Sequence, residues 1–446
     1  MIAVTCMLIK EHPKGLFLCF SLETWERFGF YGVRALLVLF MTKALMFSTQ
    51  KAGTVYGYYL GFVYLTPLLG GYIADKFWGR NKAIIIGSLI MALGQFMLAG
   101  VAFMNPEVVN DKFIWLFYLS LIIIILGGGF VKSNIFTVVG AMYEKNDPRR
   151  DSAYTIFYMG INLGAFLAPI VCGFLGERVG WGWGFGTAAT FMMIGIIHYM
   201  MFCKTQLPES VQHPASRDKH GTKINHEPLT KEEKQKLAVI FIMAFFNIFF
   251  WAAMGQAGSS LTLFAEHSTA RYISLLAWQV PTSWFQSLNP IFIVALAPLF
   301  SSLWVNLAKK QMEPSVIYKF VWGLVLASLS FLLMVLAVMV YEVSGPVSML
   351  WLVAVYLIQT VGELCLAPIG FSLISKLSPV KFASFIMGLW FTSLFVANLA
   401  SGLFAGKYDS MNHKTFFMVP VVTAGIAAIL LLLLAKPIKK WMHGVK

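Results

Sequence analysis

Charged residues are scarce in this sequence. Only 12% of the 446 residues are Asp, Glu, Lys or Arg, and the acids are the rarer sign, with 20 against 34 bases. Soluble globular proteins carry roughly 25% charged residues. The deficit argues against a soluble enzyme and against a nucleic-acid partner. The formal net charge of +14 instead matches the basic loops that flank membrane helices.

Motifs for catalysis and for metal binding are also missing. The five cysteines form no C-x-x-C pair, and no pair of histidines has metal-ligand spacing. The sequence has no G-x-x-x-x-G-K-[ST] phosphate-binding loop. We therefore expect no enzyme activity, no bound metal, no organic cofactor and no use of ATP within this chain.

Long hydrophobic runs are abundant, since 58% of the residues are apolar. A helix that crosses a bilayer needs about 20 apolar residues. Breaks at glycine, proline and charge clusters therefore predict an all-α integral membrane protein with twelve transmembrane helices. We predict them at 15–43, 52–74, 83–104, 113–142, 152–176, 183–203, 237–264, 284–308, 320–341, 347–375, 381–406 and 415–435.

Lysine and arginine set the expected orientation. With the N-terminus placed inside, 24 of the 34 bases fall in inner segments and seven in outer segments, which predicts that both termini are cytoplasmic. The polar segment 204–236 divides the spans six and six. We predict an N-terminal bundle at 1–203, a cytoplasmic linker at 204–236 and a C-terminal bundle at 237–446. Two such halves indicate a secondary transporter.

Ionisable residues inside the membrane are costly and mark candidate functional sites. Offsets of three, four and seven residues place Glu23, Glu26, Arg27 and Arg34 on one face of the first helix. Two carboxylates beside a guanidinium form a candidate proton site, because glutamate can titrate while arginine stays charged. The structural alternative is an ion-pair network that only fixes helix packing.

Two more charges lie inside other predicted spans. Lys132 follows the run Gly127–Gly129, and small residues allow helices to approach closely. Its alternative is a lysine that extends to the membrane interface. Glu363 is the lone acid of its helix. Three cations in the first half and one carboxylate in the second suit a zwitterion bound between the halves.

Three sequence motifs resemble those of one transporter family. The run from Glu23 to Phe28, with Tyr31 after it, resembles the E-x-x-E-R signature of proton-dependent oligopeptide transporters. The segment 157–164 resembles the second signature of that family, F-Y-x-x-I-N-x-G, and 71–80 resembles the loop motif of the wider major facilitator superfamily. The segments 256–260 and 286–290 also fit the family.

The resemblance implies two six-helix bundles of major facilitator type that import di- and tripeptides by proton symport and alternating access. It implies a place in the bacterial cytoplasmic membrane and protons as the coupling ion. A monomer is sufficient for this function, and the sequence leaves the oligomeric state open. By position, Glu23, Glu26 and Arg27 couple protons, Arg34 and Lys132 hold the peptide carboxylate, and Glu363 holds its amino group. The implied pocket lining is Tyr31, Tyr64, Asn162, Trp251, Asn289 and Trp390.

The sequence departs from the family pattern at two positions of the expected site. Gly255 stands where many members carry an acid, and Phe30 replaces a common tyrosine. Alternatives within the fold are a transporter of another substrate, such as nitrate or an organic anion, and a proton-driven drug or metabolite antiporter. A peptide sensor that signals through 204–236 is a further alternative.

Overall fold

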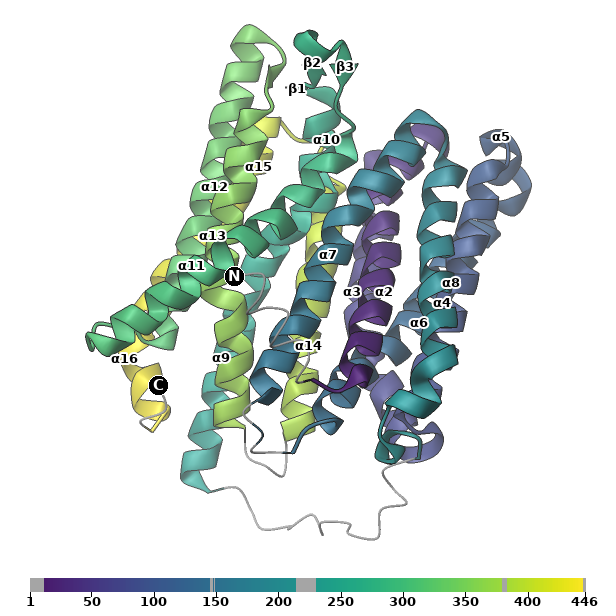
Figure 1. Ribbon diagram of the computed structural model, residues 1–446. Coiled ribbons are helices and arrows are strands. Elements are labelled where there is room, and N and C mark those ends of the chain that lie inside the picture. The colour runs from purple at the N-terminus through teal and green to yellow at the C-terminus, as the bar shows by residue number, and fades with distance from the viewer. Residues whose placement is uncertain (1–11, 145–146, 148, 214–229, 379–382, 444–446) are drawn as a thin grey trace. The chain divides into compact units, whose positions relative to one another are not determined.

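The computed structural model describes residues 12–144, 147, 149–213, 230–378 and 383–443. It is built almost entirely of helices, which run the length of each compact unit (Figure 1). Unit 1 comprises Met1–Phe40 and Leu65–Gly221, and unit 2 comprises Met41–Tyr64 and Thr222–Lys446. The helix α3 (Thr49–Ile73) contributes its first part to unit 2 and its last part to unit 1.

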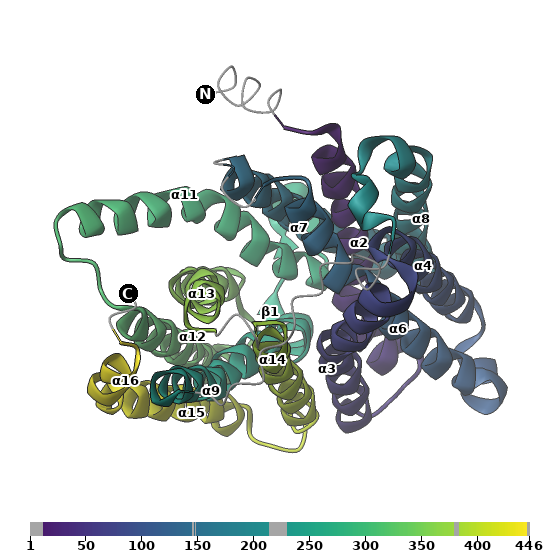
Figure 2. The same cartoon turned by 90° about the horizontal axis from the view of Figure 1, so that it is seen from below.

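Unit 1 contains five long helices and several short turns. In Figure 2, where the helices are viewed end-on, α2 lies between α7 and α8, and α4 contacts both α6 and α8. The elements are α2 (Lys14–Leu39), η2 (Ala74–Trp78), α4 (Arg80–Phe103), α5 (Pro106–Val108), η3 (Val109–Phe113), α6 (Ile114–Ala141), α7 (Arg149–Arg178), α8 (Trp181–Gln206) and η4 (Glu209–Val211).

Glycines let α7 and α6 approach their neighbours in unit 1. A Cβ atom at Gly164 of α7 would lie 2.3 Å from the carbonyl oxygen of Thr24, so only glycine allows α7 to pack this closely on α2. On α6, a Cβ at Gly127 would lie 2.4 Å from the Met91 nitrogen, and one at Gly129 would lie 2.7 Å from the Thr66 Cβ. The glycine run therefore lets α6 pack closely against α4 and α3, and this packing sets the position of Lys132 along α6's neighbours.

Unit 2 contains the remaining helices and four short strands. They are η1 (Phe40–Ala44, whose first residue belongs to unit 1), α9 (Lys231–Met254), η6 (Gly255–Gly258), α10 (Ser260–His267), β1 (Thr269–Ala270), β2 (Tyr272–Ile273), η7 (Ser274–Leu276), β3 (Trp278–Gln279), η8 (Thr282–Ser287), α11 (Leu288–Lys309), α12 (Val316–Ser344), β4 (Val347–Ser348), α13 (Leu350–Leu377), α14 (Ala383–Ala405), α15 (His413–Leu433) and α16 (Ala435–Trp441). The strands β1 and β4 pair in parallel, and β2 and β3 pair antiparallel.

The core of unit 2 forms where α9, α12, α13, α14 and α15 meet. Phe250 of α9, Phe320 of α12 and Leu431 of α15 are fully buried in one hydrophobic cluster. The single helix predicted at 237–264 is wrong in one respect, because the structure interrupts it with the 3₁₀ turn η6 between α9 and α10. Glycines at both ends of this turn, Gly255 and Gly258, weaken the helix there.

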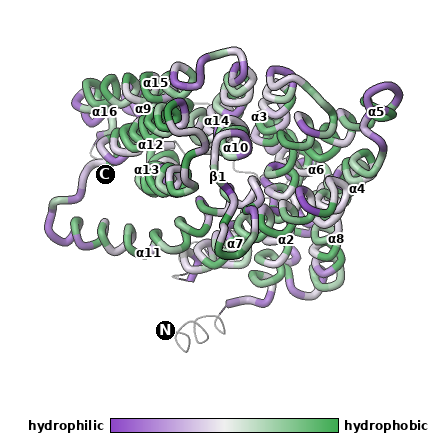
Figure 3. The backbone as a smooth tube through the Cα atoms, turned by 90° about the horizontal axis from the view of Figure 1, so that it is seen from above, coloured by the Kyte–Doolittle hydropathy of each residue, from purple (hydrophilic) through white to green (hydrophobic). Residues whose placement is uncertain are grey.

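Nine helices among the described residues are long and apolar enough to cross a membrane. Hydrophobic residues run along these helices, while hydrophilic residues gather mainly in the connections (Figure 3). Helices also occupy the predicted ranges 15–43, 52–74 and 381–406, although residues 381–382 lie outside the described part. The long apolar helices define a membrane protein.

Candidate functional site

A buried ion cluster lies on α2 in unit 1. Arg27 Nε lies 2.8 Å from Glu23 Oε1 and 2.6 Å from Glu26 Oε2. Both glutamates are 0% exposed and Arg27 is 8% exposed. The helical spacing of three and four residues brings the three groups together, so the structure joins the predicted proton-coupling residues in one cluster.

Lys132 on α6 extends this cluster. It interacts electrostatically with Glu23 and Glu26 on one hand and with Arg27 and Arg34 on the other. Its Nζ atom is buried and lies 4.3 Å from the centroid of the Phe30 ring. The lysine therefore stays inside unit 1 rather than extending to the interface. The interacting set thus contains three cations, Arg27, Arg34 and Lys132, and two acids, Glu23 and Glu26.

Aromatic rings on α2 contact the cations of this cluster. The Arg27 guanidinium lies 5.7 Å from the Phe30 ring centroid, and that of Arg34 lies 5.5 Å from the ring of Tyr31. The two rings contact each other edge to face, with centroids 5.2 Å apart. Phe30, one of the two departures from the family pattern, thus makes cation–π contacts with both Arg27 and Lys132.

The other predicted residues of the first half lie on α7 and α3. Asn162 is buried on α7, and its Nδ2 donates to the Tyr158 carbonyl oxygen at 3.0 Å. It lies two residues before Gly164, where α7 packs against the α2 backbone near Arg27. Tyr64 is half-buried at the boundary of the α3 segment that belongs to unit 2.

In unit 2 the structure pairs two of the predicted residues. Asn289 Nδ2 on α11 donates to Glu363 Oε2 on α13 at 2.8 Å and lies 3.1 Å from Thr360 Oγ1. Glu363 is half-buried. The amide therefore holds one carboxylate oxygen of Glu363 in a fixed position.

The two predicted tryptophans lie in different surroundings within unit 2. Trp390 is 2% exposed and packs edge to face on Phe320, with ring centroids 6.4 Å apart. Trp251 is half-buried at the edge of the same cluster and contacts the Phe250 ring. The roles predicted for both in a pocket stay predictions.

The position of Gly255 is filled by a neighbouring helix. A Cβ atom there would lie 2.5 Å from Ser401 Oγ and 2.8 Å from Ser401 Cβ. Gln256 Nε2 also donates to the Ser401 carbonyl oxygen at 3.0 Å, and Ser260 Oγ donates to Gln256 Oε1 at 2.6 Å. Neutral hydroxyl and amide groups occupy the space next to this backbone, which leaves no room for an acidic side chain.

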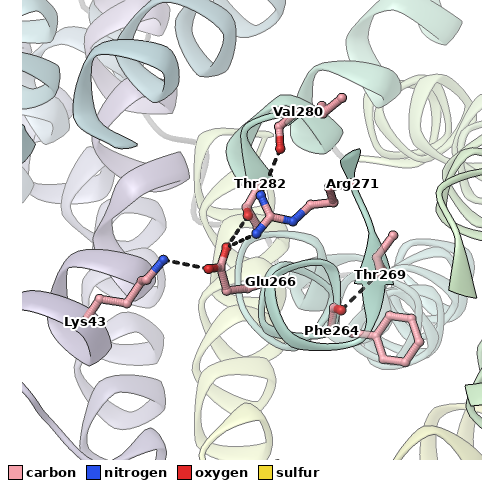
Figure 4. A network of polar contacts seen from close by, with 7 residues as sticks. All are labelled: Lys43, Phe264, Glu266, Thr269, Arg271, Val280 and Thr282. Carbon is pink, nitrogen blue, oxygen red and sulfur yellow. Dashed lines mark hydrogen bonds and ion pairs between the residues drawn. The ribbon is translucent and has the colours of Figure 1, made fainter. Parts of the chain in front are cut away.

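A second ionic network in unit 2 was missed by sequence reasoning, which gave its charged residues no role in a site. In Figure 4, Glu266 accepts from Lys43 Nζ at 2.6 Å and from Arg271 Nη2 at 2.8 Å. Thr282 also donates to Glu266, and Arg271 Nη1 donates to the Val280 carbonyl oxygen at 2.8 Å. Arg271 is only 7% exposed, so this network fixes the turn after α10.

Buried, mutually compensating charges on membrane-spanning helices are typical of the proton relays and substrate pathways of transport proteins. The particular family follows from comparison with known proteins. The chain belongs to the POT family, whose model, PTR2, matches residues 81–213 and 217–419. Its relatives are transporters and not enzymes.

Both the relatives and the solved structures align with nearly the whole length of this chain. The peptide transporter YePEPT of Yersinia enterocolitica is 34% identical, covering 98% of this chain and 96% of its own length. A di-/tripeptide transporter of Lactococcus lactis subsp. cremoris is 29% identical, with 97% of each chain covered. A crystal structure of the peptide transporter POT in complex with sulfate is 30% identical and matches with a TM-score of 0.87, covering 97% of this chain and 96% of that one.

Proposed function

We propose that this protein is a proton-coupled symporter that imports di- and tripeptides. It would work by alternating access between two six-helix bundles of major facilitator type in the bacterial cytoplasmic membrane, with both termini cytoplasmic. The observation that carries the proposal is the buried cluster in which Arg27 pairs with Glu23 and Glu26, with Lys132 beside it. The names of the relatives support peptides as the substrate.

The cluster suits proton coupling because protonation of one acid changes the compensation of the cations beside it. When a proton binds one glutamate, Arg27 or Lys132 loses part of its compensation and gains affinity for another anion. A peptide carboxylate is such an anion, and a paired arginine and lysine can hold it through charge-assisted hydrogen bonds. In the proposal, Arg34 and Lys132 bind this carboxylate, and protons are the only coupling ion.

The amino end of the peptide would be bound by Glu363. Its carboxylate accepts a hydrogen bond from Asn289, and an ionised carboxylate has lone pairs enough to accept from an ammonium group as well. A peptide would thus be recognised mainly by its two charged ends, which every di- or tripeptide shares. Side-chain selectivity would then be low.

Proteoliposomes test the proposal directly. Purified protein is reconstituted, a pH gradient that is acidic outside is imposed, and uptake of a labelled dipeptide is followed with several peptides. The proposal predicts accumulation that collapses when a protonophore is added. Uptake no greater than in empty vesicles, for every peptide tried, would contradict it.

The two same-fold alternatives give other results in this assay. A nitrate or organic-anion transporter needs no partner for an amine, so Glu363→Gln would leave its transport intact. A drug or metabolite antiporter would move protons opposite to its substrate, which a pH-sensitive dye inside the vesicles detects.

A further inference from the structure

Gln95 of α4 is a buried amide without a hydrogen-bond partner. The residue is 0% exposed, and within the described part of the chain neither its Oε1 nor its Nε2 has a partner. Leaving buried donors and acceptors unpaired costs about 1–3 kcal/mol for each group. Such a side chain calls for an explanation, and one explanation is a partner gained in another state of the protein.

The amide of Gln95 lies directly on the backbone of α2. A Cβ atom at Gly29 would lie 2.7 Å from Gln95 Nε2 and 3.0 Å from its Oε1. Gly29 is therefore the residue that makes room for the amide. Glu26 precedes it by three residues, which places the two positions on the same face of α2.

Glu26 is itself incompletely satisfied. It is 0% exposed, and its 2.6 Å contact with Arg27 is an ion pair without hydrogen-bond alignment. Among the described residues, neither of its oxygens has a hydrogen-bond donor. A buried acid and a buried amide on neighbouring helices thus both have unused hydrogen-bonding capacity.

The charged groups around Glu26 are few. Glu23, Arg27 and Lys132 form one interacting set with it. On the other helices packed against α2, α4 is charged only in its first turn, α7 only in its end turns, and α8 only in its last turn. His198 of α8 is hydrogen-bonded to Ser21. The neutral amide of Gln95 is thus the polar group that α4 presents to this stretch of α2.

We propose that Gln95 is a positioning residue that receives Glu26 when Glu26 is protonated. A carboxylic acid and a primary amide are complementary, because the acid O–H donates to the amide oxygen and the amide N–H donates to the acid carbonyl. In the ionised state Glu26 pairs with Arg27, and the Gln95 amide makes no hydrogen bond to it. When Glu26 is protonated, its ion pair with Arg27 is lost, and its side chain forms hydrogen bonds with Gln95 instead. This inference rests on the proposed proton symport.

The main test compares the pH dependence of peptide uptake in wild type, Gln95→Leu and Ser88→Ala. Leucine keeps the volume and removes both polar atoms, so it destabilises only the protonated form. We expect the pH of half-maximal uptake to fall by about one unit, the equivalent of about 1.4 kcal/mol, with unchanged peptide affinity at low pH. Ser88, which is also buried on α4 without a partner, should give no shift. An unshifted Gln95→Leu profile overturns the proposal.

A second variant guards against misfolding of Gln95→Leu. Gly29→Ala keeps the amide but pushes it away from α2, and it should shift the half-maximal pH in the same direction by a smaller amount. An infrared difference spectrum between acidic and alkaline buffer should show a protonated-carboxyl band that moves in the Gly29→Ala variant. An unmoved band overturns the proposal. This spectrum needs no transport, so wild-type protein that fails to import peptides would contradict the proposed function without deciding the role of Gln95.

Discussion

Asn289 on α11 donates a hydrogen bond to Glu363 on α13, with 2.8 Å between Nδ2 and Oε2. The two residues are 74 positions apart in the chain, so folding of unit 2 creates the pair. The amide holds one oxygen of the acid in place. The bond orients the carboxylate that the proposal assigns to the peptide ammonium group, and this role can be tested on Glu363 itself.

Glu363→Gln should weaken binding of ordinary dipeptides by about tenfold to a hundredfold. The variant removes one charge-assisted hydrogen bond to the peptide ammonium, which contributes about 1.5–3 kcal/mol. Binding of N-acetylated dipeptides should change far less. Microscale thermophoresis with both peptide types gives the comparison, and equal losses for the two types would exclude Glu363 as the amine receptor.

Lys132→Ala should weaken binding of peptides with a free C-terminus. The expected loss is about tenfold or more, because one charge-assisted contact is removed. The matched ligand is the same peptide with an amidated C-terminus, whose affinity should stay nearly constant. If both affinities are unchanged, Lys132 has no part in peptide binding.

Glu23→Gln and Glu26→Gln should separate two modes of transport. Each variant removes a group that can take up a proton, so gradient-driven uptake should be lost. Counterflow, in which labelled and unlabelled peptides exchange without net proton movement, should survive. If both modes fall to the same extent in folded protein, the cluster with Arg27 is structural, as the alternative interpretation of the sequence holds.

Gly164→Ala should destabilise unit 1. The new Cβ would meet the Thr24 carbonyl oxygen at 2.3 Å, and overpacking of this kind costs about 1–3 kcal/mol. The control is Gly100→Ala on α4, which meets nothing within 4 Å and should be neutral or stabilising by up to about 1 kcal/mol. Thermal unfolding in detergent ranks the two, and a Gly164→Ala protein as stable as its control would contradict the close packing.

Glu266→Gln and Lys43→Gln should differ in their effects on stability. Glu266 compensates Arg271, which is 7% exposed, and loss of a buried partner costs about 3 kcal/mol. The side chain of Lys43 is 44% exposed, so its removal should cost no more than about 1 kcal/mol. Thermal unfolding in detergent measures both, and equal effects would show that the network is not buried in the folded protein.

The sequence could predict what depends on local spacing. Apolar runs predicted the helices because their length matches the bilayer, and offsets of three and four predicted that Glu23, Glu26 and Arg27 share a face. The glycine run before Lys132 predicted close helix packing, which the contacts of Gly127 and Gly129 confirm.

The sequence could not predict what depends on contacts between distant segments. Neither the placement of Gln95 over Gly29 nor the bond from Asn289 to Glu363 has a local signal. The burial of Arg271 could not be predicted either, because it depends on contacts with Glu266 and with the Val280 carbonyl oxygen that form only in the folded protein. The 3₁₀ turn at Gly255 also escaped prediction, since two glycines in a long apolar run are compatible with an unbroken helix.

The central claim is that protons drive peptide uptake through the cluster around Arg27. The most direct measurement is uptake of a labelled dipeptide by proteoliposomes under an inward proton gradient, with Glu26→Gln protein as the comparison. The account predicts that wild type concentrates the peptide above its external level, that Glu26→Gln only equilibrates it, and that a protonophore removes the difference. Concentrative uptake by both proteins, or by neither, would contradict it.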